Sequence, residues 1–347
     1  MRVSSDRNAI VHRGRQAFSL VELLLAVSLM SLIVFGLYSM FNETQKALRT
    51  NVNQVDVLEA GRAAIELLVN DLEQATSPGL GVFQSLPVVP ATPPHFMSGI
   101  MTNRVGGQMS VAMPVTQELA DGTLRTNVLH EAFFLTRSNL NWVGKGFFIS
   151  PSTNAVALTP GGELNYGTLF RFSSPNVNFG ARDLSQVFQP QRRMNTNLFV
   201  NLWEAYRRAK ADPSFAVSNI VASPLIEGVV HFKLQPIDSL GRPMRYWTNN
   251  ALNESVNFRY PSVALVRDQA PGASTFVSET RSAFYGDALP AYVEVEIGVL
   301  DQTTLSRVKA LGNAALSKDY LNRQAGGVHL FRRMVPLRTA PKMHRAL

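Results

Sequence analysis

The chain has 347 residues, of which 46% are hydrophobic and 17% are charged, enough for one large domain or two smaller ones. It contains no cysteine, which excludes disulfides, thiolate metal sites and thiol nucleophiles together. The net charge of +8 lies mainly at the two ends, in residues 1–17 and 331–347, so no basic groove for nucleic acid is expected between them.

An apolar segment follows the basic amino-terminal end. Residues 18–41 contain a single charged side chain, Glu22, and as an α-helix they would span about 36 Å, enough to cross a bilayer. Arg13 and Arg15 precede the segment, and the positive-inside rule then keeps the amino terminus in the cytoplasm. The segment is longer than the apolar part of a secretory signal peptide. A carboxylate inside it is costly unless a partner neutralises the charge.

The residues around this carboxylate form a motif. In "QAFSLVELLLAV", residues 18–22 match in order the cleavage and methylation motif of type IV prepilins and type II secretion pseudopilins, so the chain resembles that family. The family usually has glycine where this chain has Ala17. The resemblance implies that prepilin peptidase cuts after Ala17, that Phe18 becomes N-methylated, and that Glu22 pairs with the terminal amine of a neighbouring subunit during assembly.

The same resemblance implies a function, partners and a location. It implies a structural subunit rather than an enzyme, without catalytic residues, cofactor or metal, that joins a periplasmic type II secretion pseudopilus. Its partners would be prepilin peptidase, other minor and major pseudopilins or pilins, and the inner-membrane assembly platform. The protein would cross the inner membrane once, with its carboxyl-terminal domain in the periplasm, and would be associated with the fibre after assembly. A large globular domain favours the tip, where no repeated packing crowds it.

Residues 42–77 predict an amphipathic stalk helix that ends at Ser77, Pro78 and Gly79. An apolar stripe at helical spacing is expected to pack against the globular domain rather than form a free coiled coil. The phrase "GRAAIELLVNDLEQA" is similar to the end of this helix in J-type minor pseudopilins and W-type minor pilins. The stripe consists of Leu48, Val52, Val55, Leu58, Ile65, Leu68, Leu72 and Ala75.

Residues 78–347 predict a globular domain with strands and helices. The proline-rich stretch 78–95 is typical of an extended linker. Helices are expected at 196–213, with Leu198, Leu202 and Tyr206 on one side, and from a capping residue, Asp301, onward. In the expected strand at 291–300, apolar residues alternate with more polar ones, so one face of the sheet should be exposed to solvent. The other expected strands are 131–137, 145–150, 166–172 and 228–237.

The expected fold is therefore α+β and pilin-like: a long amino-terminal helix packed on an antiparallel sheet, with extra helices and loops. Residues 1–17 would be a prepilin leader, 18–41 a transmembrane helix, 42–77 the stalk, and 78–347 the periplasmic domain. Segments 225–247, 288–301 and 330–339 also resemble J-type and W-type proteins. Long insertions at 78–130 and 173–222 leave the subtype open.

No catalytic or metal-binding constellation is expected in the globular part. The six histidines lack metal spacing, and solvated surface positions are expected for them, His231 included. Gly161 and Gly162 indicate a turn rather than a phosphate loop. The acids Asp238, Asp287 and Asp301 should bond to the local backbone at turns, and calcium is not expected.

Three alternatives to a secretion pseudopilin stay open. The chain could be a minor pilin of a type IV pilus, or a membrane-anchored periplasmic binding protein or enzyme that uses the apolar segment only as a tether. A tether predicts that Glu22 can be replaced by Leu with function retained. A subunit of a DNA-uptake fibre would need a basic stripe between residues 80 and 330, and the sequence has no such cluster.

Overall fold

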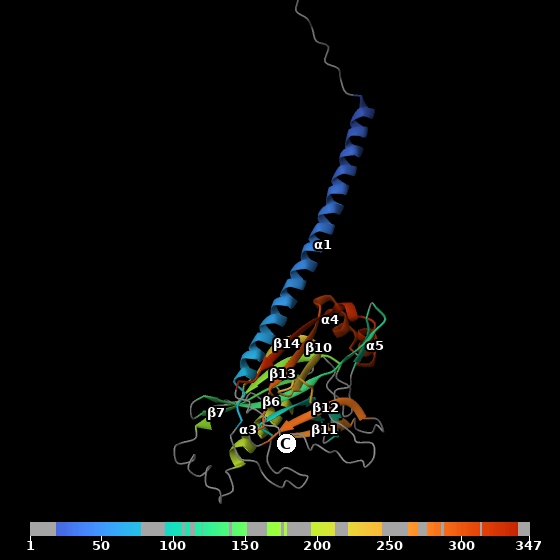
Figure 1. The fold of residues 1–347 in the computed structure, drawn as a ribbon. Coiled ribbons are helices and arrows are strands. Elements are labelled where there is room, and N and C mark those ends of the chain that lie inside the picture. The colour runs from blue at the N-terminus through green and yellow to red at the C-terminus, as the bar shows by residue number, and fades with distance from the viewer. Residues whose placement is uncertain are drawn as a thin grey trace, which may run out of the picture. The chain divides into compact units, whose positions relative to one another are not determined.

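A computed structural model of the chain divides it into two compact units, Met1–Asn53 and Gln54–Leu347. The helix α1, Leu20–Glu73, is 54 residues long and begins in the first unit and ends in the second (Figure 1). The structure describes residues 19–77, 94–105, 108–111, 115–119, 121–138, 141–150, 165–174, 177–178, 196–211, 221–244, 263–269, 276–285, 288–312 and 314–338.

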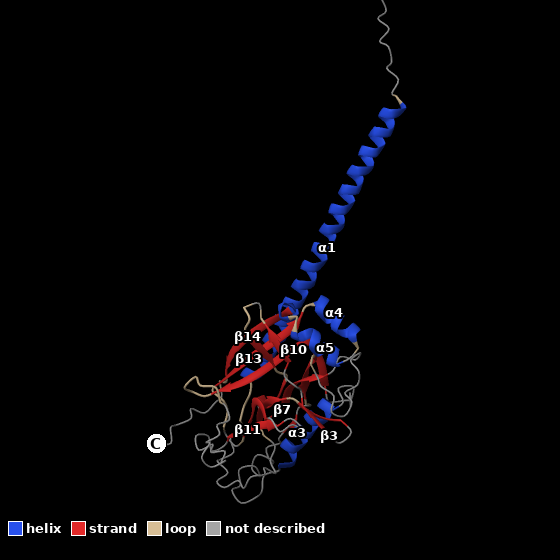
Figure 2. Cartoon of the chain, turned by 90° about the vertical axis from the view of Figure 1, so that its right-hand side faces the viewer, coloured by secondary structure: helices blue, strands red, loops and turns tan. Residues whose placement is uncertain are grey.

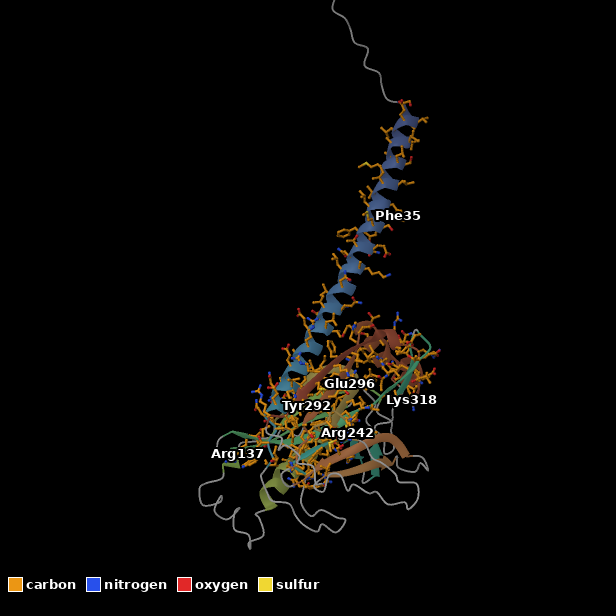
Figure 3. All side chains as sticks on the ribbon, viewed as in Figure 1. Phe35, Arg137, Arg242, Tyr292, Glu296 and Lys318 are labelled. Carbon is orange, nitrogen blue, oxygen red and sulfur yellow. The ribbon has the colours of Figure 1, made fainter. Side chains whose placement is uncertain are left out.

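The first unit consists, where it is described, of Ser19 and α1 as far as Asn53, and its apolar part is residues 20–41. The large hydrophobic side chains from Leu20 to Phe41 are between 53% and 76% exposed, and they point outward on all sides, as around Phe35 in Figure 3. Such a helix has no polar face to turn toward water. By length and composition, α1 is long and apolar enough to cross a membrane.

The second unit is built on a sheet in which every pairing between neighbouring strands is antiparallel. Along the sheet the strands follow the order β11-β12-β1-β6-β7-β8-β10-β13-β14, and β9 also pairs with β7. The strands of this sheet are β1 Phe96–Ile100, β6 His130–Ser138, β7 Asn141–Ser150, β8 Gly167–Ser173, β9 Val177–Asn178, β10 Val221–Ile237, β11 Val263–Gln269, β12 Phe276–Phe284, β13 Tyr292–Leu300 and β14 Val328–Pro336.

The sheet is curled, so the segment that leads into β6 reaches β10, which is not its neighbour in the strand order. Leu129 forms a parallel bridge with Phe232, and the Phe232 amide donates to the Val128 carbonyl at 2.8 Å. Two hairpins complete the strands: β2 Thr102–Val105 with β3 Gln108–Val111, and β4 Val115–Glu118 with β5 Leu124–Asn127. The α+β class and the antiparallel sheet agree with the expectation from sequence.

The predicted strands are confirmed, and the clearest of them forms the centre of the core. On β13, Val293, Val295, Ile297 and Val299 are all at most 1% exposed, whereas Tyr292 on the other face is 37% exposed. The predicted strand 131–137 lies within β6, 145–150 within β7 and 228–237 within β10. The predicted strand 166–172 overlaps β8. The helix α1 covers this apolar face of the sheet with its last turns, where Leu68 and Leu72 are fully buried.

The predicted apolar stripe of α1 is only partly correct. Ile65, Leu68, Leu72 and Ala75 are buried as expected. Leu48, Val52 and Val55 are instead 58%, 57% and 50% exposed. The first side chain of α1 that packs against the core is Val57, because the helix meets the apolar face of the sheet only from there onward.

In the part of the chain that the structure describes, three further helices lie on the sheet or beside it. Helix α3, Thr196–Ala211, buries Leu202, Tyr206 and Ala209, as the 196–213 pattern predicts. Helices α4, Gln302–Leu311, and α5, Ala314–Asn322, pack together over a second small core (Figure 2). A short 3-10 turn, η1 Ala325–Gly327, follows them.

The cap at Asp301 is confirmed, since its Oδ1 accepts from the Thr304 amide at 2.6 Å. The expected helix is nevertheless broken in two at Gly312, whose φ of 59° is left-handed and favours glycine.

Candidate functional site

The amino-terminal motif is the candidate site with the clearest chemistry, and the structure describes it from Ser19 onward. Ala17 and Phe18, the residues expected at the cleavage and methylation site, lie outside the described residues. Glu22 lies in the first turn of α1, three residues after Ser19. The expected roles of these three residues therefore stay predictions.

Ser19 and Glu22 form a reciprocal cap at the start of α1. The Ser19 amide donates to Glu22 Oε2 at 3.0 Å, and the Glu22 amide donates to Ser19 Oγ at 3.3 Å. The Ser19 hydroxyl also donates to Oε2 at 3.1 Å. This is the capping box of a Ser-x-x-Glu sequence, which supplies acceptors to amides that lack a helical partner.

The capping box gives Glu22 a local role that the prepilin resemblance does not include. The sequence "SLVE" carries the signal, so the cap could have been predicted from sequence. Both hydrogen bonds to the carboxylate end on Oε2, and Oε1 accepts none from the described part of the chain. A carboxylate held this way can still accept one further donor, such as a protonated amine.

The other end of α1 is fixed to the sheet by a buried carboxylate. Asp71 is 3% exposed, and its oxygens bind Lys145 Nζ on β7 at 2.6 Å and Arg171 Nε on β8 at 2.6 Å. The hydrogen bond to Asp71 raises the pKa of the Arg171 guanidinium. A second pair joins Glu73 to Arg338 just after β14, at 2.7 Å. These contacts prevent the last turn of the helix from sliding along the sheet.

A second buried carboxylate fixes α3. Glu131 on β6 is 1% exposed and contacts Lys210 and Tyr206 of α3, with Arg281 of β12 at 3.8 Å. Burial, and next the charge of Glu131, raise the pKa of the Tyr206 hydroxyl well above its ordinary value, so this hydroxyl stays a donor. The cluster holds α3 on the sheet by pairing every charge it buries.

The prediction of solvated histidines is wrong for three of the six. His95, His130 and His231 are 4%, 2% and 4% exposed. The expectation failed because residues distant in sequence lie against these rings: Ala288 against His95, Leu234 against His130, and Val128 and Glu296 against His231. Strand alternation does not reveal such contacts. His329 on β14 is partly exposed, and His12 and His344 lie outside the described residues.

Each buried histidine has polar partners from the fold. His95 Nε2 lies 2.7 Å from the Ala288 carbonyl oxygen. His231 Nδ1 accepts from the Val128 amide at 3.2 Å, and its Nε2 lies 3.1 Å from Glu296 Oε2. Among the residues that the structure describes, no group of three His, Asp or Glu side chains could hold a metal ion.

The acids expected at turns behave as predicted where they are described. Asp238 Oδ1 accepts from the Leu240 amide at 2.9 Å and from the Arg242 amide at 2.8 Å. Its Oδ2 pairs with the Arg242 side chain. Asp287 and the glycine pair 161–162 lie outside the described residues, as does the proline-rich stretch over 78–93.

The fold and the amino-terminal segment define an α+β protein in which one helix of the described residues is long and apolar enough to cross a membrane. Comparison of the chain with known protein families, with curated proteins and with solved structures found no match. The functional interpretation therefore depends on the motif at residues 17–22 and on the fold itself.

Proposed function

We propose that the chain is a prepilin-like structural subunit, a minor pseudopilin that prepilin peptidase processes and that joins a periplasmic type II secretion fibre. The observation that carries this proposal is the match of residues 18–22 to the prepilin motif, placed after a small residue, Ala17, and at the start of an apolar helix. Residues 18–22 match five positions of the family motif at the place where cleavage and assembly need them. Such a match is stronger evidence for a prepilin than an apolar anchor alone would be.

The architecture of the second unit supports the proposal. A fibre subunit must transmit force from its helix to its domain, so the two must be joined firmly. Here α1 continues into the domain without a break, buries Leu68 and Leu72, and is pinned through Asp71 to two strands. A long helix on an antiparallel sheet is also the arrangement that the resemblance implies. The pilin-like fold itself is part of the proposal.

The partners follow from this function. The subunit would meet prepilin peptidase and the assembly platform in the inner membrane, and afterwards the other minor and major pseudopilins or pilins. The domain would lie in the periplasm, because the basic residues stand before the apolar helix. Its size favours a tip position. A minor pilin of a type IV pilus would use the same chemistry in a different machine.

The capping box favours a competing function. Ser19 already donates to one carboxylate oxygen of Glu22. Glu22 would therefore have a role, capping the helix, even in a simple tether for a periplasmic binding protein or enzyme. The two functions make opposite demands on its charge. A capping box accepts Gln in place of Glu at its third helical position, whereas pairing with a positive amine needs the charge.

Two substitutions separate the functions. Glu22→Gln keeps the cap and removes the charge, and Ser19→Ala keeps the charge and removes the serine side of the cap. For an assembling subunit, Glu22→Gln inserts into the membrane normally but is lost from purified fibres, while Ser19→Ala is still incorporated. For a tether, Glu22→Gln behaves as the unchanged protein does. Fibre incorporation relative to membrane abundance is the quantity to measure, by quantitative blotting of sheared fibres and membranes.

The mature amino terminus gives a direct test of processing. Mass spectrometry of the protein from its native envelope should find a chain that begins with N-methylated Phe18. A protein that still begins at Met1 would exclude processing by the peptidase. If the peptidase does process the chain, replacing Ala17 by Gly, the usual family residue, should raise the processed fraction, and Ala17→Leu should abolish processing.

A further inference from the structure

The segment that leads into β6 meets β10 across the curled sheet. Val128 and Leu129 connect β5 to β6 and lie against β10, where the Phe232 amide donates to the Val128 carbonyl at 2.8 Å. The Val128 amide donates to the ring of His231, and the Met101 amide donates to the Leu129 carbonyl at 2.9 Å. We call this contact between residues 128–129 and β10 the seam.

The contacts of His231 require a neutral ring with one tautomer. Its Nδ1 lies 3.2 Å from the Val128 amide nitrogen, which is a donor, so Nδ1 is the unprotonated nitrogen. Its Nε2 lies 3.1 Å from Glu296 Oε2 and therefore carries the proton. Because both ring nitrogens are used in this way, the neutral form fits the site completely.

A second proton would turn the acceptor at Nδ1 into a donor that faces another donor, the Val128 amide. The bond across the seam would be lost, while the bond to Glu296 would become stronger. Since the ring is 4% exposed, no water can substitute without movement of the seam. Protonation is therefore coupled to withdrawal of residues 128–129 from β10.

The surrounding charges have mixed effects on this protonation. Glu296 favours the charged ring, and both His130 and Lys233 oppose it, but burial is the largest effect and lowers the pKa of the His231 imidazole below its ordinary value of 6.5. The charge of Glu296 is also shared with an arginine, since Arg332 Nε lies 3.1 Å from Oε1. The titratable and charged groups near the ring are Glu296 on β13, His130 on β6, Lys233 on β10, Arg332 on β14 and Arg125 on β5.

We propose that His231 is a pH-sensitive latch that holds the seam of the curled sheet closed at neutral pH and releases it on acidification. The released element is the segment of residues 128–129 itself, because β4 is also held by α5, where Gln117 Nε2 donates to the Leu321 carbonyl at 2.7 Å, and the start of β6 is paired with β1. This inference does not rest on the proposed fibre function, and a tethered domain would carry the same latch.

Hydrogen exchange of the full-length protein in detergent micelles tests the latch. The protection of the Val128 amide is compared with that of the Leu337 amide, which bonds to the Ala291 carbonyl at 3.0 Å. Between about pH 7.5 and about pH 5.5, opening that takes up one proton should reduce the protection of Val128, relative to Leu337, by up to about tenfold per pH unit. A ratio that stays constant over this range overturns the proposal.

Two variants identify the residue responsible. His231→Asn offers a neutral oxygen near the position of Nδ1, so it should keep protection at neutral pH and remove its pH dependence. His329→Asn, at a partly exposed histidine on β14, is the matched control and should keep the dependence of the unchanged protein. A pH dependence that persists in His231→Asn overturns the proposal.

If His231→Asn does not fold, the unchanged protein decides the question. The pKa of His231 can be measured from the exchange rate of its ring C2 hydrogen by mass spectrometry. A value below 6.5, together with the loss of Val128 protection, supports the latch. A value at or above 6.5 overturns it, because the folded seam would then favour the charged ring.

Discussion

Three carboxylates of the second unit, Asp71, Glu131 and Asp238, are almost completely buried, at 3%, 1% and 3% exposed. Burying an ionised carboxylate is expensive unless cations or several donors surround it. Asp71 and Glu131 contact cations from elements distant in sequence, whereas Asp238 uses donors of its own turn. The first two therefore join elements, and the third only shapes a loop.

Removing the charge of Asp71 should weaken the attachment of α1. In Asp71→Asn, Lys145 and Arg171, whose side chains are 11% and 29% exposed, would remain close together without a carboxylate, so the unfolding free energy should fall by about 3 kcal/mol. Urea unfolding followed by circular dichroism measures this. The matched control is Asp319→Asn, whose pair with Arg323 is mostly exposed and should change stability by less than about 0.5 kcal/mol. Equal effects of the two substitutions would contradict the anchoring role.

The stability of the domain should fall in two stages on acidification. His231 has a lowered pKa, so above its ordinary value of 6.5 it carries no penalty, and below that value the unfolded chain binds more protons than the folded one. The hydrogen bond from His231 lowers the pKa of the Glu296 carboxyl, so its contribution is present above 4.5 and is lost as pH falls below that value. Urea midpoints measured at several pH values from about 7.5 to about 4 should stay level above 6.5 and fall as the pH is lowered below it. A midpoint that rises between about pH 7 and about pH 5.5 would give the wrong sign for His231.

At the scale of elements, α1 changes character along its length although it is a single helix. Its first part is apolar on every side, and an apolar stripe continues through Leu48, Val52 and Val55, which are at least half exposed. The helix packs against the core from Val57 onward, and at Gly61 it lies very close to β14. The glycine permits this approach, because a Cβ built there would lie 2.2 Å from a ring carbon of Phe331 on β14.

The substitution Gly61→Ala should therefore destabilise the domain although it raises helix propensity. In an open helix position the change usually stabilises by about 1 kcal/mol. Here the overlap with Phe331 should outweigh that gain and cost about 1–3 kcal/mol in total, measured by urea unfolding. Gly36→Ala is the control in the same helix, since nothing lies within 4 Å of the added carbon. Adding Phe331→Leu to Gly61→Ala should recover part of the lost stability. If no stability is recovered, the overlap with Phe331 is not the cause of the loss.

At the scale of the whole molecule, the sequence predicts single elements better than the layers they form. Alternation identifies β13, and the cap at Asp301 identifies the start of α4, because both signals are local. The burial of His231 could not be predicted in the same way. Apolar and polar residues alternate along its strand as they would on a strand with one solvent-exposed face. The ring is nevertheless covered by Val128 and Glu296, which are distant in sequence.

In the candidate site, too, local features can be predicted from the sequence and contacts between distant residues cannot. The prepilin motif and the capping box of Ser19 and Glu22 can both be read from consecutive residues. The attachment of α1 cannot, because Asp71 meets Lys145 and Arg171 only when β7 and β8, which lie far along the chain from the helix, pack against it. Likewise, a stripe of apolar residues does not show which of its members are buried, since Leu48 is 58% exposed and Leu68 is fully buried.

Shortened chains test whether the last turns of α1 belong to the core of the domain. A chain that begins at Gln54 keeps every helix residue buried against the sheet, so it should fold without detergent and unfold cooperatively. A chain that begins at Gln74 loses Ile65, Leu68 and Leu72 and leaves an apolar face of the sheet bare, which should favour aggregation and binding of a hydrophobic dye. Near-ultraviolet circular dichroism and calorimetry compare the two. If the chain from Gln74 unfolds as cooperatively and at the same temperature as the longer one, the helix is an attachment to a domain that is complete without it.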